Sequence, residues 1–139
     1  MRKALILVLI TFPGYAFACS CLRTALEDQV KDSEKIFVGV LTSSKIVNPR
    51  TDKEWPYIEG TIEVETIIKG KVGKIEKVRT GLGGGDCGIS MTTGRAYVIF
   101  SISEENYIGI CGASGELRRY EEKEYVEKLK NLAGKGSNK

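Results

Sequence analysis

Four cysteines are spaced in a way that limits how this 139-residue chain can fold. Cys19 and Cys21 are separated by one residue, whereas Cys87 and Cys111 lie far along the chain. A bridge between the first two would close a cramped ring around Ser20, so we expect each to pair with one distant cysteine. Each such bridge closes a long loop and contributes on the order of 4 kcal/mol in the chain-entropy model. Either pairing fastens the early segment to two distant parts of the fold.

The first 18 residues have the pattern of a secretory signal peptide. Arg2 and Lys3 are basic, and residues 4–12 form an apolar run that is too short for a membrane span of about 20 residues. Ala16 and Ala18 are the small residues of a cleavage site, so cleavage after Ala18 would make Cys19 the first residue of an exported protein. Two alternatives stay open: the segment is retained as an anchor, or Cys19 is lipidated, although the residues before it differ from the usual lipoprotein pattern.

Composition and cysteine spacing exclude several classes of function. Without the signal peptide the chain has 19 basic and 18 acidic residues, so its net charge falls from +3 to about +1, and nothing indicates a nucleic-acid binder. The chain has no histidine, which excludes imidazole catalysis and histidine-ligated metal sites. The absence of Cys-x-x-Cys argues against a thiol–disulfide oxidoreductase, and an oxidising compartment argues against a zinc site made of the four thiolates.

Hydrophobic periodicity predicts one mainly β domain over residues 19–134. The first strand should be buried on both faces, and Ile58, Ile62, Val64 and Ile68 should share one face of the second strand. Five strands joined by short turns favour a closed or partly closed β-barrel, and a Greek-key barrel of the OB-fold type fits this count. The expected elements are a short helix at 24–31 capped by Thr24, strands at 35–47, 58–68, 75–80, 96–102 and 107–111, a longer helix at 116–132 with Gly134 as its C-cap, and a disordered tail at 135–139.

A glycine-rich segment, residues 81–88, surrounds Cys87. It lacks the Gly-Lys-Ser/Thr ending of a phosphate-binding loop and precedes no predicted helix, so nucleotide binding is not indicated. We expect these glycines to let the backbone approach the N-terminal segment closely enough for a disulfide to form.

Together these features resemble the N-terminal, netrin-like domain of the tissue inhibitors of metalloproteinases. The resemblance covers nearly all of the chain after the signal peptide. It is carried by Cys19-Ser20-Cys21, the strand pattern, the loop around Cys87, and Cys111 before a C-terminal helix. It implies the disulfides Cys19–Cys87 and Cys21–Cys111.

The resemblance also implies a function. In that family the α-amine and carbonyl oxygen of the first cysteine chelate the catalytic zinc of a protease, and the next side chain enters the pocket beside the zinc. An α-amine loses its proton more readily than a lysine, which suits it as a zinc ligand. The chain would then be a monomer that needs no cofactor, and its partner would be a zinc endopeptidase. The residues implied are Cys19 as chelator, Ser20 as pocket residue, Cys21 and Leu22 along the cleft, and Asp86, Cys87 and Gly88 as a second edge.

The chain also departs from the animal inhibitors, which have a third disulfide in this domain and a second domain. We therefore expect a stand-alone, bacterial relative, and we expect no extra contacts from the modest loop at 48–56. The alternative function is a non-inhibitory netrin-like or OB-type binding or adhesion module of the cell envelope or extracellular space. We do not expect an enzyme, because the carboxylates of Glu63 and Glu65 are typical of a solvated strand face.

Overall fold

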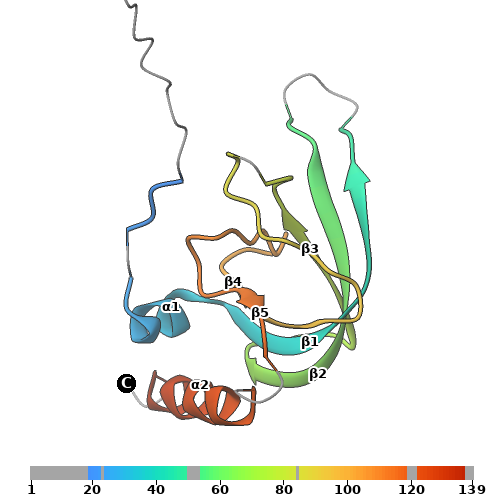
Figure 1. Cartoon of the computed structure of the whole chain (residues 1–139). Coiled ribbons are helices and arrows are strands. Elements are labelled where there is room, and N and C mark those ends of the chain that lie inside the picture. The colour runs from blue at the N-terminus through green and yellow to red at the C-terminus, as the bar shows by residue number, and fades with distance from the viewer. Residues whose placement is uncertain (1–18, 23, 50–53, 84, 119–121, 137–139) are drawn as a thin grey trace, which may run out of the picture.

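A computed structural model describes residues 19–22, 24–49, 54–83, 85–118 and 122–136 of this chain. The expected signal peptide at 1–18 and residues 137–139 of the expected tail lie outside the described residues. The described chain is mainly β, with one five-stranded antiparallel sheet and two helices (Figure 1). The elements in order are α1 (Leu26–Asp32), β1 (Lys35–Val47), β2 (Tyr57–Lys69), β3 (Ile75–Thr80), β4 (Ala96–Ser101), β5 (Gly115–Glu116) and α2 (Glu122–Gly136).

The sheet has the strand order β3-β2-β1-β4-β5, and its described strands do not close into a barrel. The strand predicted at 107–111 is wrong, because only Tyr107 forms a bridge, parallel to Arg79 of β3. Ile108 N donates to Arg79 O at 2.8 Å, but the chain then turns at Gly109–Gly112, so no longer ladder forms. The two-residue strand β5, which the sequence analysis missed, pairs with β4 instead.

Both helices begin later than their sequences suggested. Glu116 pairs with Tyr97 in the sheet, and Leu117 N donates to Ala96 O at 2.8 Å, so this stretch continues the sheet and α2 begins only at Glu122. α2 also ends later, at Gly136, so Gly134 lies inside it and is not its C-cap, and the first two residues of the tail expected at 135–139 are helical. Residues 119–121 lie outside the described residues. Ala25, not Thr24, occupies the N-cap of α1.

Strand β1 supplies side chains to two hydrophobic cores, as its buried pattern predicted. Phe37 and Leu41 lie in the first core, between the strands, and Ile36 and Val38 lie in the second core, between the sheet and the helices. The remaining buried members of the first core are Ile62, Val78, Tyr97, Ile99 and Ile108, and those of the second are Val30, Val98, Phe100 and Leu129.

The predicted single apolar face of β2 is wrong. The pairing of β1 with β2 shifts between Val38↔Thr66 and Gly39↔Val64, so β2 contains an extra residue at that point. An irregularity of this kind moves the residues that follow to the opposite face. Val64 accordingly packs against the first core, whereas Ile68 packs against the second.

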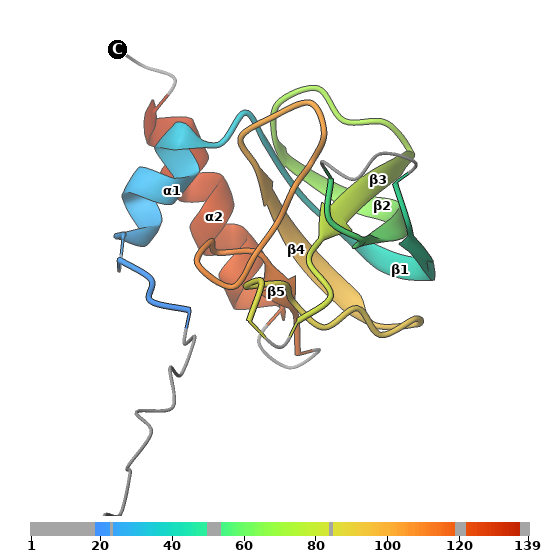
Figure 2. The ribbon, with the colours of Figure 1, turned by 90° about the horizontal axis from the view of Figure 1, so that it is seen from above.

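The two helices lie side by side against one face of the sheet (Figures 1 and 2). The ammonium group of Lys69, at the end of β2, donates to the carbonyl oxygens of Val30 (2.7 Å) and Lys31 (2.8 Å) and so caps the C-terminal turn of α1. Among the described residues no helix is both long and apolar enough to cross a bilayer.

We predict that Leu129→Ala lowers the free energy of unfolding by about 2–5 kcal/mol, because this leucine is fully buried where α2 meets the sheet. Urea denaturation followed by circular dichroism, with the disulfides intact, measures the change. Ile75→Ala is the matched control, since Ile75 is 67% exposed and its truncation should change stability by no more than about 0.5 kcal/mol. Equal effects from the two substitutions would contradict the placement of α2.

Candidate functional site

Residues 19–22, which we call the N-terminal arm, are fastened to the domain by two disulfides. Cys19 is bonded to Cys87 with their Cα atoms 5.7 Å apart, and Cys21 is bonded to Cys111 with a Cα–Cα distance of 5.1 Å. This is the pairing that the resemblance implied. Ser20 lies exposed between the two bridges, and the side chain of Leu22 is 93% exposed. The arm therefore presents Ser20 and Leu22 outward while both of its cysteines are anchored.

The two anchor points of the arm are held next to each other by the backbone. Ile110 N donates to Cys87 O at 2.9 Å, one residue before Cys111. The same segment is tied to the sheet through Ile108, which is buried in the first core and hydrogen bonded to Arg79. Because the two anchors are hydrogen bonded to each other and linked to the core through Ile108, the position of the arm is fixed relative to the sheet.

The glycine-rich segment folds around one carboxylate, and we call residues 81–88 the Asp86 loop; residue 84 lies outside the described residues. The carboxylate of Asp86 accepts hydrogen bonds from the backbone N–H groups of Leu82 (2.5 Å), Gly83 (2.7 Å) and Gly88 (3.2 Å). A Cβ atom on Gly88 would lie only 2.2 Å from the carbonyl oxygen of Gly81. Crowding therefore explains the glycine at position 88, whereas Gly83 and Gly85 have open space around them and positive φ angles of 86° and 141°, which favour glycine.

The hydrogen bonds within the loop also set the charge state of Asp86. Desolvation by the surrounding backbone raises the pKa of this carboxyl, but the N–H donors of Gly88, Leu82 and Gly83 together outweigh it and leave the pKa below its ordinary value of 3.8. Asp86 is therefore ionised at neutral pH, and its carboxylate is hydrogen bonded to the backbone of its own loop. In this structure its clearest role is to hold the loop that carries Cys87.

The structure gathers at one end of the sheet all seven residues that the sequence analysis singled out. The arm lies beside the Asp86 loop because the Cys19–Cys87 bond joins them, and Gly88 belongs to the same loop. They offer different chemistry: Ser20 and Leu22 are exposed, whereas the three cysteines among them form disulfides and the carboxylate of Asp86 accepts hydrogen bonds from backbone donors. Ser20 and Leu22 are thus the arm side chains that a partner could contact.

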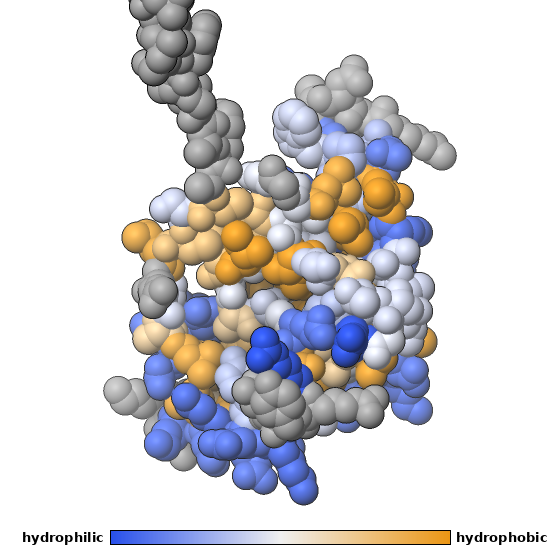
Figure 3. Space-filling view, viewed as in Figure 1, coloured by the Kyte–Doolittle hydropathy of each residue, from blue (hydrophilic) through white to orange (hydrophobic). Residues whose placement is uncertain are grey.

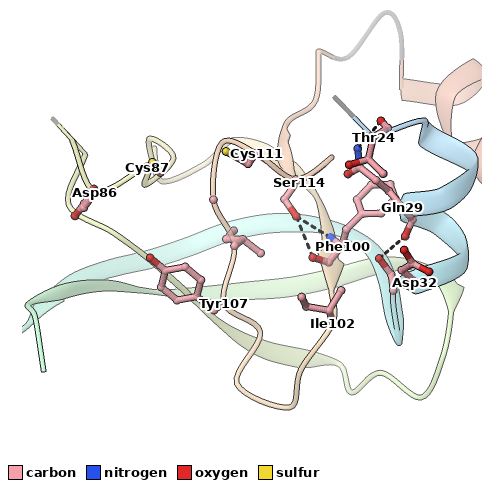
Figure 4. Close-up of a pocket in the computed structure, with 14 residues that line it drawn as sticks. Thr24, Gln29, Asp32, Asp86, Cys87, Phe100, Ile102, Tyr107, Cys111 and Ser114 are labelled. Carbon is pink, nitrogen blue, oxygen red and sulfur yellow. Dashed lines mark hydrogen bonds between the residues drawn. The ribbon is translucent and has the colours of Figure 1, made fainter. Parts of the chain in front are cut away.

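A hollow of about 450 Å³ lies between α1, the Asp86 loop and residues 100–114. Figure 4 shows Gln29 and Asp32 of α1 on one side of it and Tyr107 on the other. Cys87 and Cys111, to which the arm is bonded, form part of its wall. Sequence analysis did not find this hollow, because its lining comes from segments that are distant in sequence and share no motif.

A second groove, of about 500 Å³, continues from the Asp86 loop toward the end of the β1–β2 loop. Both hollows are lined by Asp86 and Tyr107, so they adjoin each other. Trp55 lines the second groove and is 88% exposed. Sequence analysis assigned no role to this residue, although a tryptophan in an otherwise polar turn was an available signal.

The surface around the arm is apolar. Figure 3 shows apolar side chains gathered on the face beside the arm, whereas hydrophilic side chains predominate over α2. Contiguous exposed apolar surface of this kind marks interaction sites in many proteins. The large exposed apolar side chains on the arm and on the segments that surround it are Leu22, Leu82, Ile102, Tyr107 and Ile110.

The described residues contain no group of three or more His, Cys, Asp or Glu side chains that could hold a metal ion. All four cysteines form disulfides, which leaves no thiolate for a four-cysteine zinc site. Comparison with protein-family models and with characterised proteins finds no match to this chain. The functional argument therefore depends on the geometry of the arm and on the resemblance noted in the sequence.

We predict that Asp86→Ala speeds amide hydrogen exchange at Leu82 and Gly83, because both donors lose their acceptor. In the unsubstituted protein the pKa of Asp86 is lowered. Its contribution to the stability of the loop is therefore complete above about pH 5 and is lost as the pH falls below 3.8 toward the lowered pKa. Exchange measured by NMR checks both effects. Glu104→Ala is the control, since it also removes an exposed acidic residue; equal protection in both variants would contradict this role of Asp86.

Proposed function

We propose that the chain, once cleaved after Ala18, inhibits a zinc endopeptidase by placing the α-amine and carbonyl oxygen of Cys19 on the catalytic zinc of that enzyme. The observation that carries this proposal is the anchoring of the arm: two disulfides hold a short exposed segment against the domain at the residue that would become the N-terminus. The zinc belongs to the target, and the chain contributes the two ligand atoms.

The anchoring supports chelation in two ways. The disulfide at Cys19 restricts the orientation of its backbone nitrogen and carbonyl oxygen, so little further ordering is needed when they bind. The disulfide at Cys21 prevents the arm from folding back, which leaves Ser20 between two fixed points. In the proposed complex the Ser20 side chain enters the pocket beside the zinc, and Leu22 lies farther along the cleft of the protease.

We also propose that the domain is a partly closed OB-type Greek-key barrel of the netrin-like kind and acts as an exported monomer. The parallel bridge between Arg79 and Tyr107 supports this architecture, because it joins β3 to the segment that follows β4. Two disulfides in a domain of this size are typical of proteins that leave the reducing cytoplasm.

The alternative is a non-inhibitory binding module. One observation favours it: the groove beside Trp55 is lined by no residue of the arm and has an exposed aromatic side chain of its own. A module of this kind would not depend on a free amine at Cys19. The two functions therefore differ in how they respond to a change at the N-terminus.

The proposal predicts that one alanine added before Cys19 weakens inhibition by about 100-fold or more, the size of effect that accompanies loss of a central interface anchor. The added residue moves the free amine away from the zinc while leaving the disulfides in place. Both forms are titrated against a thermolysin-type and a metzincin-type endopeptidase with a fluorogenic peptide substrate.

The control for this comparison is the fold of the extended form, which should show the same disulfide-linked peptides and the same urea midpoint as the native form. Equal inhibition by the two forms would overturn chelation. An absence of inhibition by the native form against both enzymes would favour the binding-module alternative.

A further inference from the structure

The groove beside Trp55 combines exposed aromatic rings with charged hydrogen-bonding groups. It lies between the end of the β1–β2 loop, the end of β3 and the turn before Tyr107. Trp55 is 88% exposed and Tyr107 is 51% exposed, so their rings are available to a ligand, whereas Tyr57 is half-buried. Tryptophan is highly buried on average and is enriched at interfaces, so a side chain this exposed is a candidate ligand contact.

The polar part of the groove is fixed in position. The guanidinium of Arg79 lies 5.0 Å from the ring centroid of Tyr57 and donates a hydrogen bond of 3.2 Å to a carboxylate oxygen of Glu105. The backbone of Arg79 is also bonded on both sides, because its N–H donates to Asn106 O and its carbonyl accepts from Ile108 N. The groove therefore presents an ordered donor and acceptor between aromatic side chains, with little reorganisation needed on binding.

The charge of the groove excludes polyanions. Its lining contains three carboxylates, from Glu54, Asp86 and Glu105, against the single guanidinium of Arg79. A net negative lining repels the phosphates of nucleic acids and the sulfates of acidic glycans. A ligand that suits the groove has apolar faces for stacking, hydroxyl or amide groups for hydrogen bonding, and no negative charge.

We propose that this groove binds a neutral oligosaccharide, with the C–H faces of pyranose rings stacked on Trp55 and Tyr107. The hydroxyl groups of the sugar bond to the guanidinium of Arg79 and the carboxylate of Glu105. The position agrees with the OB-type barrel proposed above, since that fold binds oligonucleotides and oligosaccharides at strands 2 and 3 and the adjoining loops. The carboxylates of the lining favour the neutral sugar over the oligonucleotide. No residue of the arm lines the groove, and Asp86 is its one member among the residues implied to contact a protease, so a bound sugar would not occupy the position of Cys19.

The chain offers a direct probe of this binding, because Trp55 is its only tryptophan. Chitohexaose and cellohexaose, the neutral probes, are titrated against the mature protein, and a saturable change in tryptophan emission is the expected result. Tyr107→Ala should weaken binding of the same sugar about tenfold, since it removes one stacking ring, whereas Tyr107→Phe should change it less than about twofold. A heparin-derived octasaccharide and a deoxythymidine octamer should not bind.

Isothermal titration with Trp55→Ala provides a second test that does not depend on the fluorophore. This side chain is almost fully exposed, so its truncation should leave the fold intact while abolishing the sugar-induced heat. Ile75→Ala, which changes an exposed residue outside the groove, should bind as the native protein does.

The proposal is overturned if neither neutral sugar binds at millimolar concentration, if Trp55→Ala binds unchanged, or if the anionic probes bind more tightly. Protease inhibition should be the same in Trp55→Ala, because Trp55 does not line the hollow beside the arm, so failure here leaves the inhibitor proposal untouched.

Discussion

Two disulfides and one backbone hydrogen bond determine where the N-terminal arm lies. The disulfides join Cys19 and Cys21 to segments far along the chain, and the bond from Ile110 N to Cys87 O holds those two segments together. The arm alone is too short to bury apolar surface, and its side chains are exposed. The order of the arm therefore comes from the covalent bonds, and the side chains of Ser20 and Leu22 are accessible to a partner.

The framework behind the arm depends on a strand that is buried on both faces. β1 fills one core with Phe37 and Leu41 and the other with Ile36 and Val38, so the sheet and the two helices are joined through a single element. A domain of this size buries only part of the surface that its unfolded chain exposes, so disulfides at its edge add stability where the cores do not reach. The same arrangement leaves the end of the sheet opposite the helices for the Asp86 loop and the groove beside Trp55.

Strand periodicity predicted β1 and β3 with their observed bounds, and the resemblance implied the two disulfides that bring the arm to the Asp86 loop. Local signals in the sequence failed where tertiary contacts determine the secondary structure or the strand register. The apolar spacing of Leu117 suggested a helix, yet its N–H bonds to Ala96 O in the sheet. The shift of register in β2 and the groove beside Trp55 have no sequence motif, since each arises from segments brought together only by folding.

The central claim is that the exported chain begins at Cys19, with a free α-amine and with its sulfur already bonded to Cys87 of the Asp86 loop. Mass spectrometry of the protein purified from its native host, before and after digestion without reduction, tests this claim most directly. We expect an intact mass equal to residues 19–139 less four hydrogens, with an unmodified α-amine and linked peptides containing Cys19 with Cys87 and Cys21 with Cys111. A different first residue, an acylated amine, or peptides that link Cys19 to Cys111 would contradict the account.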